Sequence, residues 1–248
     1  MSSAEERIDH AFRSNANVLD LIGLGLRTLP ESLGKLKSVR TLQLSYNNLD
    51  TLPGIVRALT GLRELDLSAN NLTELPSWIG DFRQLMTLRV SSNQLKELPE
   101  ALGKLHQLQR FHASDNRLSA LPRSLWKLSA LRSLILSDNQ LPYIPKDIGD
   151  LKHLEILDIS GNQLDRLPAE LGALTALEQL NAGQNELTSI PKSLSNLVRL
   201  TILDLSSNRL WKLPDWLNEL KSLYRLMLHN CQNMGFRDQK ETLDCKDQ

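Results

Sequence analysis

Six residues near the middle of the chain have side-chain types that anchor protein interfaces. Arg89, His112 and Ile135 follow one another at intervals of 23 residues, and Asp115 and Asp138 keep the same interval. Arginine in mixed polar and apolar surroundings is enriched at the energetic centres of interfaces. The alternative interpretation is that these are ordinary solvated residues without a binding role. The candidate partner-binding residues are Arg89, Arg110, His112, Ile135, Asp115 and Asp138.

Residues for catalysis or metal binding form no comparable pattern. Cys231 as a nucleophile would need a nearby base, and His229 is the only candidate. Because buried thiols are usually inert, we favour a packing role for Cys231. The histidines have no second His or Cys at metal-ligand spacing, and the motifs GxxxxGK[ST], HExxH, CxxC and GxSxG do not occur. We therefore expect no enzyme activity, no cofactor, no metal and no small-molecule substrate.

Charge and cysteine content limit the possible partners and compartment. Lys and Arg total 29 and Asp and Glu total 29, so no net charge attracts the chain to nucleic acid or to an anionic membrane. No run of eighteen apolar residues and no N-terminal signal peptide are present, and there are only two cysteines. We expect a cytoplasmic monomer with a protein partner, and neither a nucleic-acid nor a membrane partner.

A repeat of 23 residues positions all of these side chains. The pattern LxLxxNxLxxLP begins at Leu42, begins again at Leu65, 23 residues later, and continues without a slip. The first repeat has Leu24 where the others have Asn, and the last has Cys231. The repeated asparagines are Asn47, Asn70, Asn93, Asn116, Asn139, Asn162, Asn185 and Asn208.

Each part of the repeat has a physical reason. The alternation of Leu65 and Leu67 with polar residues indicates a short strand with one buried face. Asn70 follows at the turn, where its amide can donate to and accept from backbone groups. Pro76 fixes φ at the start of a return segment on which Ile79 faces the core. Since one coil cannot bury its own apolar face, successive coils must stack.

The predicted fold is therefore an α/β solenoid. We expect a right-handed superhelix bent into an arc, with a parallel sheet on the concave face and short helical or 3-10 return segments on the convex face. Residues 1–15 are predicted to form a capping helix, in which Ser3 and Glu6 make a capping box and Ile8, Ala11 and Phe12 share the buried face. Nine to ten repeats occupy 16–236, and 237–248 form a polar tail, which we expect to be frayed.

Aromatic residues are expected to protect the C-terminal end. Phe236 has the offset from Cys231 that Leu52 has from Asn47, so it is predicted to fill the last core position. Trp211 and Trp216 have two interpretations, an exposed partner-binding patch or a cap over the last repeat, and we favour the cap.

The repeat resembles the leucine-rich repeat family, in its LxxLxLxxNxLxxLPxxLxxLxxL class of 23 residues. Within that class the chain is similar to the intracellular Ras-group repeats of Ras suppressor, Scribble and Erbin, and to those of bacterial Roco proteins. The resemblance implies a non-catalytic scaffold or adaptor that binds a protein on the concave face. The alternative is the targeting part of an enzyme system, such as a bacterial effector acting in a host cytosol or a GTPase-signalling protein. A glycan would need an aromatic platform on that face, which offers only Tyr46 and Tyr224.

Overall fold

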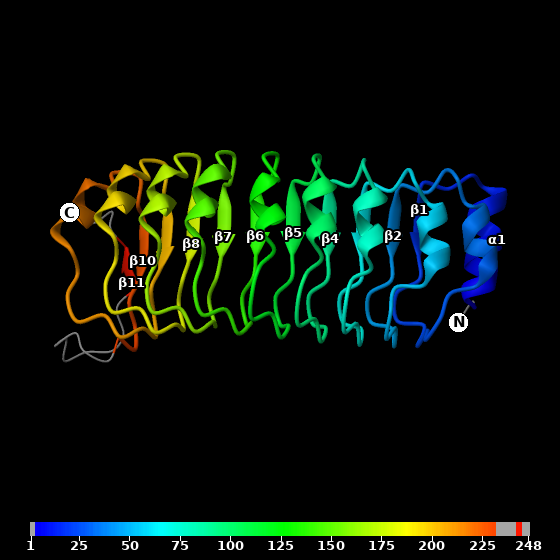
Figure 1. Cartoon of the computed structure of the whole chain (residues 1–248), viewed down its shortest axis with the longest axis horizontal. Coiled ribbons are helices and arrows are strands. Elements are labelled where there is room, and N and C mark those ends of the chain that lie inside the picture. Colours follow the sequence, from blue (N-terminus) through cyan, green and yellow to red (C-terminus); the bar gives the residue numbers. More distant parts are fainter. Residues whose placement is uncertain (1–2, 232–241, 245–248) are drawn as a thin grey trace. The chain divides into compact units, whose positions relative to one another are not determined.

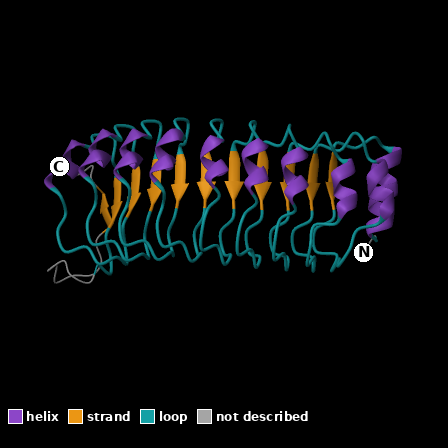
Figure 2. Ribbon diagram, in the orientation of Figure 1, coloured by secondary structure: helices purple, strands orange, loops and turns teal. Residues whose placement is uncertain are grey.

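The computed structural model describes residues 3–231 and 242–244 (Figure 1). The chain divides into two compact units, Met1–Leu131 and Arg132–Gln248, and the architecture of each is given by itself. Both are stacks of similar coils, in which a three-residue strand lies on one side and a short 3-10 helix on the other (Figure 2).

The first unit begins with one α-helix and continues with five coils. Its strands are parallel and paired without a register shift, so that Leu42 on β2 lies between Leu19 on β1 and Leu65 on β3. Residues one repeat apart therefore stand side by side on the sheet. The elements are α1 (Ala4–Arg13), β1 (Val18–Asp20), η1 (Glu31–Lys35), β2 (Thr41–Gln43), η2 (Gly54–Ala58), β3 (Glu64–Asp66), η3 (Ser77–Asp81), β4 (Thr87–Arg89), η4 (Glu100–Lys104), β5 (Arg110–His112) and η5 (Arg123–Lys127).

The second unit repeats this plan with five parallel strands. A further strand, β11, pairs antiparallel with β10, with Leu226 opposite Leu243. The elements are β6 (Ser133–Ile135), η6 (Lys146–Asp150), β7 (Ile156–Asp158), η7 (Ala169–Ala173), β8 (Gln179–Asn181), η8 (Lys192–Asn196), β9 (Ile202–Asp204), η9 (Asp215–Glu219), β10 (Arg225–Met227) and β11 (Thr242–Asp244).

Leucine supplies the core of both units in the positions that the repeat predicts. The middle residue of each strand from β1 to β10 is buried, as at Leu65 and Leu157, and so are residues of the return segments such as Ile79 and Phe82. A proline precedes every 3-10 helix that the structure describes, with φ between −61° at Pro53 and −75° at Pro214. The predicted parallel sheet and 3-10 return segments are confirmed, and the fold is a leucine-rich repeat solenoid.

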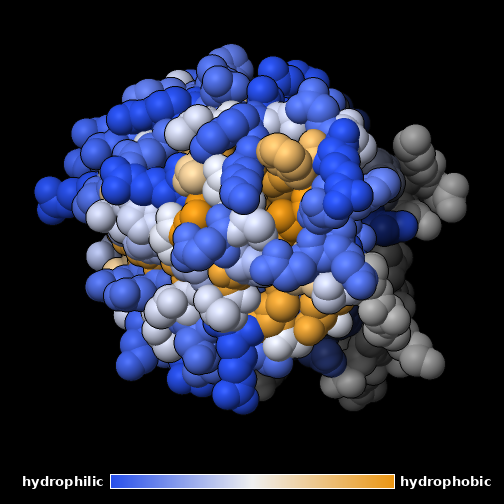
Figure 3. Space-filling model, turned by 90° about the vertical axis from the view of Figure 1, so that its right-hand side faces the viewer, coloured by the Kyte–Doolittle hydropathy of each residue, from blue (hydrophilic) through white to orange (hydrophobic). Residues whose placement is uncertain are grey.

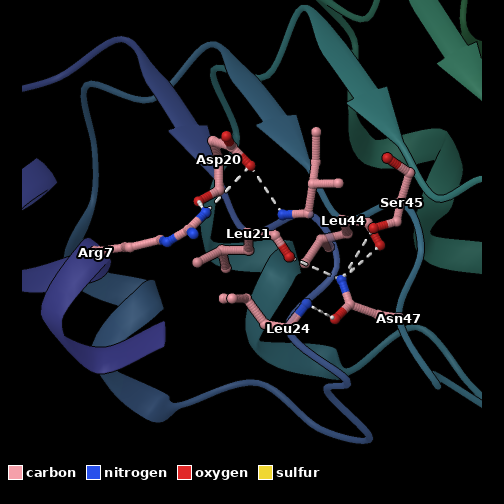
Figure 4. Close-up of polar contacts among 8 residues, drawn as sticks. Arg7, Asp20, Leu21, Leu24, Leu44, Ser45 and Asn47 are labelled. Carbon is pink, nitrogen blue, oxygen red and sulfur yellow. Dashed lines mark hydrogen bonds and ion pairs between the residues drawn. The ribbon is translucent and has the colours of Figure 1, made fainter. Parts of the chain in front are cut away.

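Buried asparagines close the turns by joining adjacent coils. The Asn47 Nδ2 atom donates to the carbonyl oxygens of Leu21 at 2.8 Å and Leu44 at 3.0 Å, and its Oδ1 accepts from the Leu24 amide at 3.1 Å (Figure 4). Asn70, Asn93 and the later asparagines repeat these bonds one coil further on. Backbone groups that lie beyond the sheet ladder are thus satisfied without water. The predicted role of the asparagines is confirmed.

Helix α1 covers the first coil, although one of its predicted contacts is wrong. The capping box forms, because the Glu6 amide donates to Ser3 Oγ at 3.2 Å and the Ser3 amide donates to Glu6 Oε2 at 2.9 Å. Ile8 and Ala11 are buried, but Phe12 is 56% exposed. The buried residues of α1 are Ala4, Ile8 and Ala11, so Phe12 lies at the edge of the face that the first coil covers. Hydrophobic side chains accordingly interrupt the polar surface at this end (Figure 3).

The C-terminal aromatic residues divide between core and surface. Trp216 is 8% exposed and packs as the cap interpretation requires, whereas Trp211 is 70% exposed. The predicted core position of Phe236 lies outside the described residues. Strand β11 falls within the segment predicted as a polar tail, where no strand was predicted.

Candidate partner-binding site

The sheet places Arg89, Arg110 and His112 together on neighbouring strands of the first unit, and we call these three residues the basic patch. Arg89 on β4 is the register partner of His112 on β5, and Arg110 is the partner of Thr87. The side chains beneath them, Leu88 and Phe111, are fully buried, so the two strands form a rigid base. The 23-residue spacing thus brings these three predicted residues into one cluster.

The two arginines of the basic patch have no acidic partner. Among the residues that the structure describes, no carboxylate lies within ion-pair distance of Arg89 or Arg110. Some arginines of this unit do form ion pairs, such as Arg7, which lies 3.5 Å from Asp20 Oδ1, and Arg57, which lies 2.8 Å from Asp81 Oδ2. No ion pair within the described part of the unit therefore holds either guanidinium, although Asp66 on β3 is the register partner of Arg89.

The pKa of His112 is affected by the charges of the two arginines. Burial lowers the pKa of its imidazole, and the nearby Arg89 and Arg110 guanidinium groups lower it further, while Asp66 acts in the opposite direction. The ordinary pKa is 6.5, so the side chain is neutral at pH 7. The formal charge of the basic patch at neutral pH is consequently carried by the two arginines.

The last residue of each strand shows why these positions are unusual. On five other strands an Asp or Asn oxygen at this position accepts a hydrogen bond from the backbone amide two residues later, as in Asp66 to Ser68 at 2.9 Å and Asp204 to Ser206 at 2.8 Å. Arg89 and Ile135 cannot provide this bond, because their side chains have no acceptor. This distinction was not predicted, although the triplet Asp-x-Ser recurs in the sequence and indicates it. The five acceptors are Asp20, Asp66, Asp158, Asn181 and Asp204.

The backbone conformation at Asp115 and Asp138 gives a structural reason for aspartate at these two positions. Their φ angles are +52° and +55°, in the left-handed region. From Asn47 onward, the residue just before each repeated asparagine, and the one before Cys231, has a positive φ angle. Examples are Tyr46 at +57° and Ala69 at +53°. Asp and Asn tolerate this region better than most residues. Asp115 is exposed at the turn beyond His112, so it lies at the border of the basic patch.

Ile135 and Asp138 belong to the second unit, whose sheet surface is more apolar. Ile135 on β6 is the register partner of Asp158, and Ile156 and Ile202 face outward on β7 and β9. The Asp138 amide donates to the Ser160 carbonyl at 2.9 Å. These two predicted residues therefore lie in the second unit, whereas the basic patch lies in the first.

Two residues that the alternation predicts to be outward are buried. Thr87 on β4 is 2% exposed and Ser133 on β6 is 7% exposed. Both are small side chains at the first position of a strand. On β4, Arg89 is therefore the side chain that a partner can contact.

Cys231 has the properties of a packing residue. Its thiol donates to the Leu205 carbonyl with an Sγ to oxygen distance of 3.5 Å. Burial raises the pKa of the Cys231 thiol, which disfavours the thiolate needed for nucleophilic attack. Among residues 3–231 and 242–244, no group of three or more His, Cys, Asp or Glu side chains is arranged to hold a metal ion. None of the helices in the same residues has the length and apolar character needed to cross a membrane.

Comparison with known proteins identifies the family. Residues 14–72 and 83–141 match the family described as leucine rich repeat, and residues 119–226 match the leucine-rich repeat region. A leucine-rich repeat protein of Leptospira interrogans is 32% identical with a TM-score of 0.66, covering 89% of this chain and 69% of that one. The chain belongs to the leucine-rich repeat family.

Two receptor structures are also similar to this leucine-rich repeat chain. The ectodomain of the plant membrane receptor kinase GASSHO1/SCHENGEN3 from Arabidopsis thaliana, solved in complex with Casparian strip integrity factor 2, is 34% identical with a TM-score of 0.70. That match covers 86% of this chain and 30% of the ectodomain. A TDR receptor is 28% identical with a TM-score of 0.69, covering 82% of this chain and 41% of the receptor. A search of curated protein sequences finds no match.

Proposed function

We propose that this leucine-rich repeat chain is a non-catalytic interaction module that binds a protein on the outward side chains of its sheet. Leucine-rich repeat domains are generally binding modules, and one of the similar receptor ectodomains was solved with its ligand. The single observation that carries the proposal is the basic patch, where two arginines lie on adjacent strands without an acidic partner among the described residues. The residues proposed to contact the partner are Arg89, Arg110, His112 and Asp115 in the first unit, and Ile135 and Asp138 in the second.

Preorganisation supports a binding role for this surface. Arg89 sits on a strand whose middle residue is buried and whose backbone is paired on both sides, with β3 and with β5. Docking on such a surface orders few additional groups, so less interaction energy is lost to conformational entropy. The asparagine bonds between coils add to this rigidity.

Site-specific photocross-linking tests the proposal. A photoreactive p-benzoylphenylalanine in place of Glu64 lies on β3, one strand from Arg89, and the same group in place of Lys104 lies on η4, on the helical side of the coil. In extracts of the native source, we expect the Glu64 position to cross-link a protein that the Lys104 position does not. We also expect Arg89→Ala with Arg110→Ala to abolish that cross-link. Equal cross-linking from both positions, or insensitivity to the double variant, would refute the proposed site.

We also propose the repeat class of this chain, the bounds of its repeats and its cellular role. We propose membership of the Ras-group class, supported by the unbroken 23-residue step, with repeats over 16–236 between a cap in 1–15 and a tail in 237–248. A cytoplasmic scaffold or signalling role is supported by the low cysteine content and by the packing role of Cys231.

A further inference from the structure

We infer that the partner presents carboxylate side chains to the basic patch, so that the ligand is an acidic protein segment held across β4 and β5. The inference rests on the proposed function and names the chemistry of its partner. It follows from charge complementarity, because Arg89 and Arg110 stand on adjacent strands of the sheet and neither has an ion pair among the described residues.

The spacing of the arginines suits two carboxylates. Adjacent strands lie about 4.8 Å apart, and Arg110 is the register partner of Thr87, two residues before Arg89, so the two arginines stand diagonally across β4 and β5. Each guanidinium can bind one carboxylate through two parallel hydrogen bonds, which is the strongest side-chain pairing available to arginine. Two acidic residues close together in the partner's sequence would therefore meet two donors.

The surroundings of the basic patch limit the acidic part of the ligand to a width of about two strands. On one side β3 presents Glu64 and Asp66, and Asp66 is already bonded to the Ser68 amide. Beyond the strand end, Asp115 is exposed at the turn. These carboxylates would repel a long acidic run, so the complementary segment has a pair of acidic residues flanked by neutral or basic ones.

His112 provides a reporter inside this site. Its imidazole pKa is lowered partly by Arg89 and Arg110, and Asp66 from β3 raises it. Ligand carboxylates between the arginines would offset the arginine contribution. Binding of an acidic segment should therefore raise the His112 pKa, whereas binding of a neutral segment should not.

A random peptide library displayed on phage and selected against the full chain provides the test. We expect enriched peptides to have two acidic residues within four positions, and Arg89→Glu with Arg110→Glu to reduce their binding at least tenfold. The matched control is Arg83→Glu with Lys104→Glu, which makes the same charge change on exposed residues away from the sheet face. That control should change binding less than twofold.

The outcomes separate this inference from the proposed function. Enriched peptides without an acidic bias, but sensitive to His112→Ala or to the arginine variant, would overturn the inference and leave the proposed site intact. Peptides insensitive to every change on the sheet face would overturn both. For the enriched acidic peptide, NMR titration should show a higher His112 pKa than with the same peptide carrying Gln for Glu; an equal pKa would contradict the inference. If a phosphoserine replacing one Glu binds more than tenfold tighter, the site recognises phosphate and the assignment to carboxylate side chains is wrong.

Discussion

The strand ends of β7 and β9 in the second unit differ from those of β4 and β5 in the first. Asp158 and Asp204 each accept from a backbone amide and a serine hydroxyl two residues later, with oxygen to oxygen distances of 2.6 Å. Arg89 occupies the same repeat position but cannot make such a bond. A solenoid can thus use one column of outward residues for local structure in some coils and leave it available for binding in others.

This contrast gives departures from a repeat a physical meaning. Variation at an outward position is uninformative when every residue is equally solvated. It becomes informative when the residue common to several coils makes a hydrogen bond that the replacing residue cannot make. Arg89 is such a replacement.

The asparagine turns are the feature that both units share, and their loss should have the largest effect. Asn93→Ala removes side-chain bonds to three carbonyls and the Leu72 amide, and Asn162→Ala removes the equivalent set in the second unit. We expect each to lower the free energy of unfolding by about 3 kcal/mol, because buried backbone groups lose their partners. Urea denaturation measures this, with the exposed Asn48→Ala as control. A loss below about 1 kcal/mol in both variants would contradict the account.

Substitution at the strand ends tests the contrast itself. Asp158→Ala removes acceptors for the Ser160 amide and hydroxyl, so we expect the free energy of unfolding to fall by about 1 kcal/mol. Arg89→Ala removes no ion pair within the described part of the chain, so the change should stay within about 0.5 kcal/mol. Thermal and urea denaturation of the two single variants compare them directly. Equal losses would show that both positions serve the fold alike.

The pH dependence of stability gives the smallest effect. The folded pKa of His112 lies below its ordinary value of 6.5, so between these values the unfolded chain binds more protons. The contribution of neutral His112 to the free energy of unfolding is fully present above pH 6.5. It is lost as the pH falls through the folded pKa. We expect His112→Gln to reduce this acid-side loss, and Arg89→Ala to raise the His112 pKa measured by NMR. An unchanged His112 pKa in Arg89→Ala would contradict the electrostatic effect of Arg89 on His112.

The sequence predicts most of the fold because each feature depends on local periodicity. Leu65 and Leu67 indicate the strand, Asn70 the turn and Pro76 the return segment, and stacking follows from their repetition. Phe12 was placed wrongly because helical spacing defines a face but not how much of it the next coil covers. The burial of Thr87 depends on neighbouring side chains, and the left-handed backbone at Tyr46 and Ala69 has no glycine to indicate it.

The candidate site was only partly accessible from the sequence. The 23-residue interval predicted that Arg89 and His112 would be neighbours, since register follows from the repeat. The absence of a carboxylate beside Arg89 within the described chain depends on rotamers and distances. The structural role of Asp66 and Asp158 similarly required the positions of the Ser68 and Ser160 amides.

Affinity for the cross-linked partner tests the central claim most directly. Isothermal titration calorimetry would compare the wild-type chain, Arg89→Glu with Arg110→Glu, and the control Arg83→Glu with Lys104→Glu. If the basic patch is the energetic centre of binding, the first variant should bind about 100-fold more weakly, corresponding to two anchors of about 1.4 kcal/mol each, with the control unchanged. Wild-type affinity in the Arg89 and Arg110 variant would contradict the account.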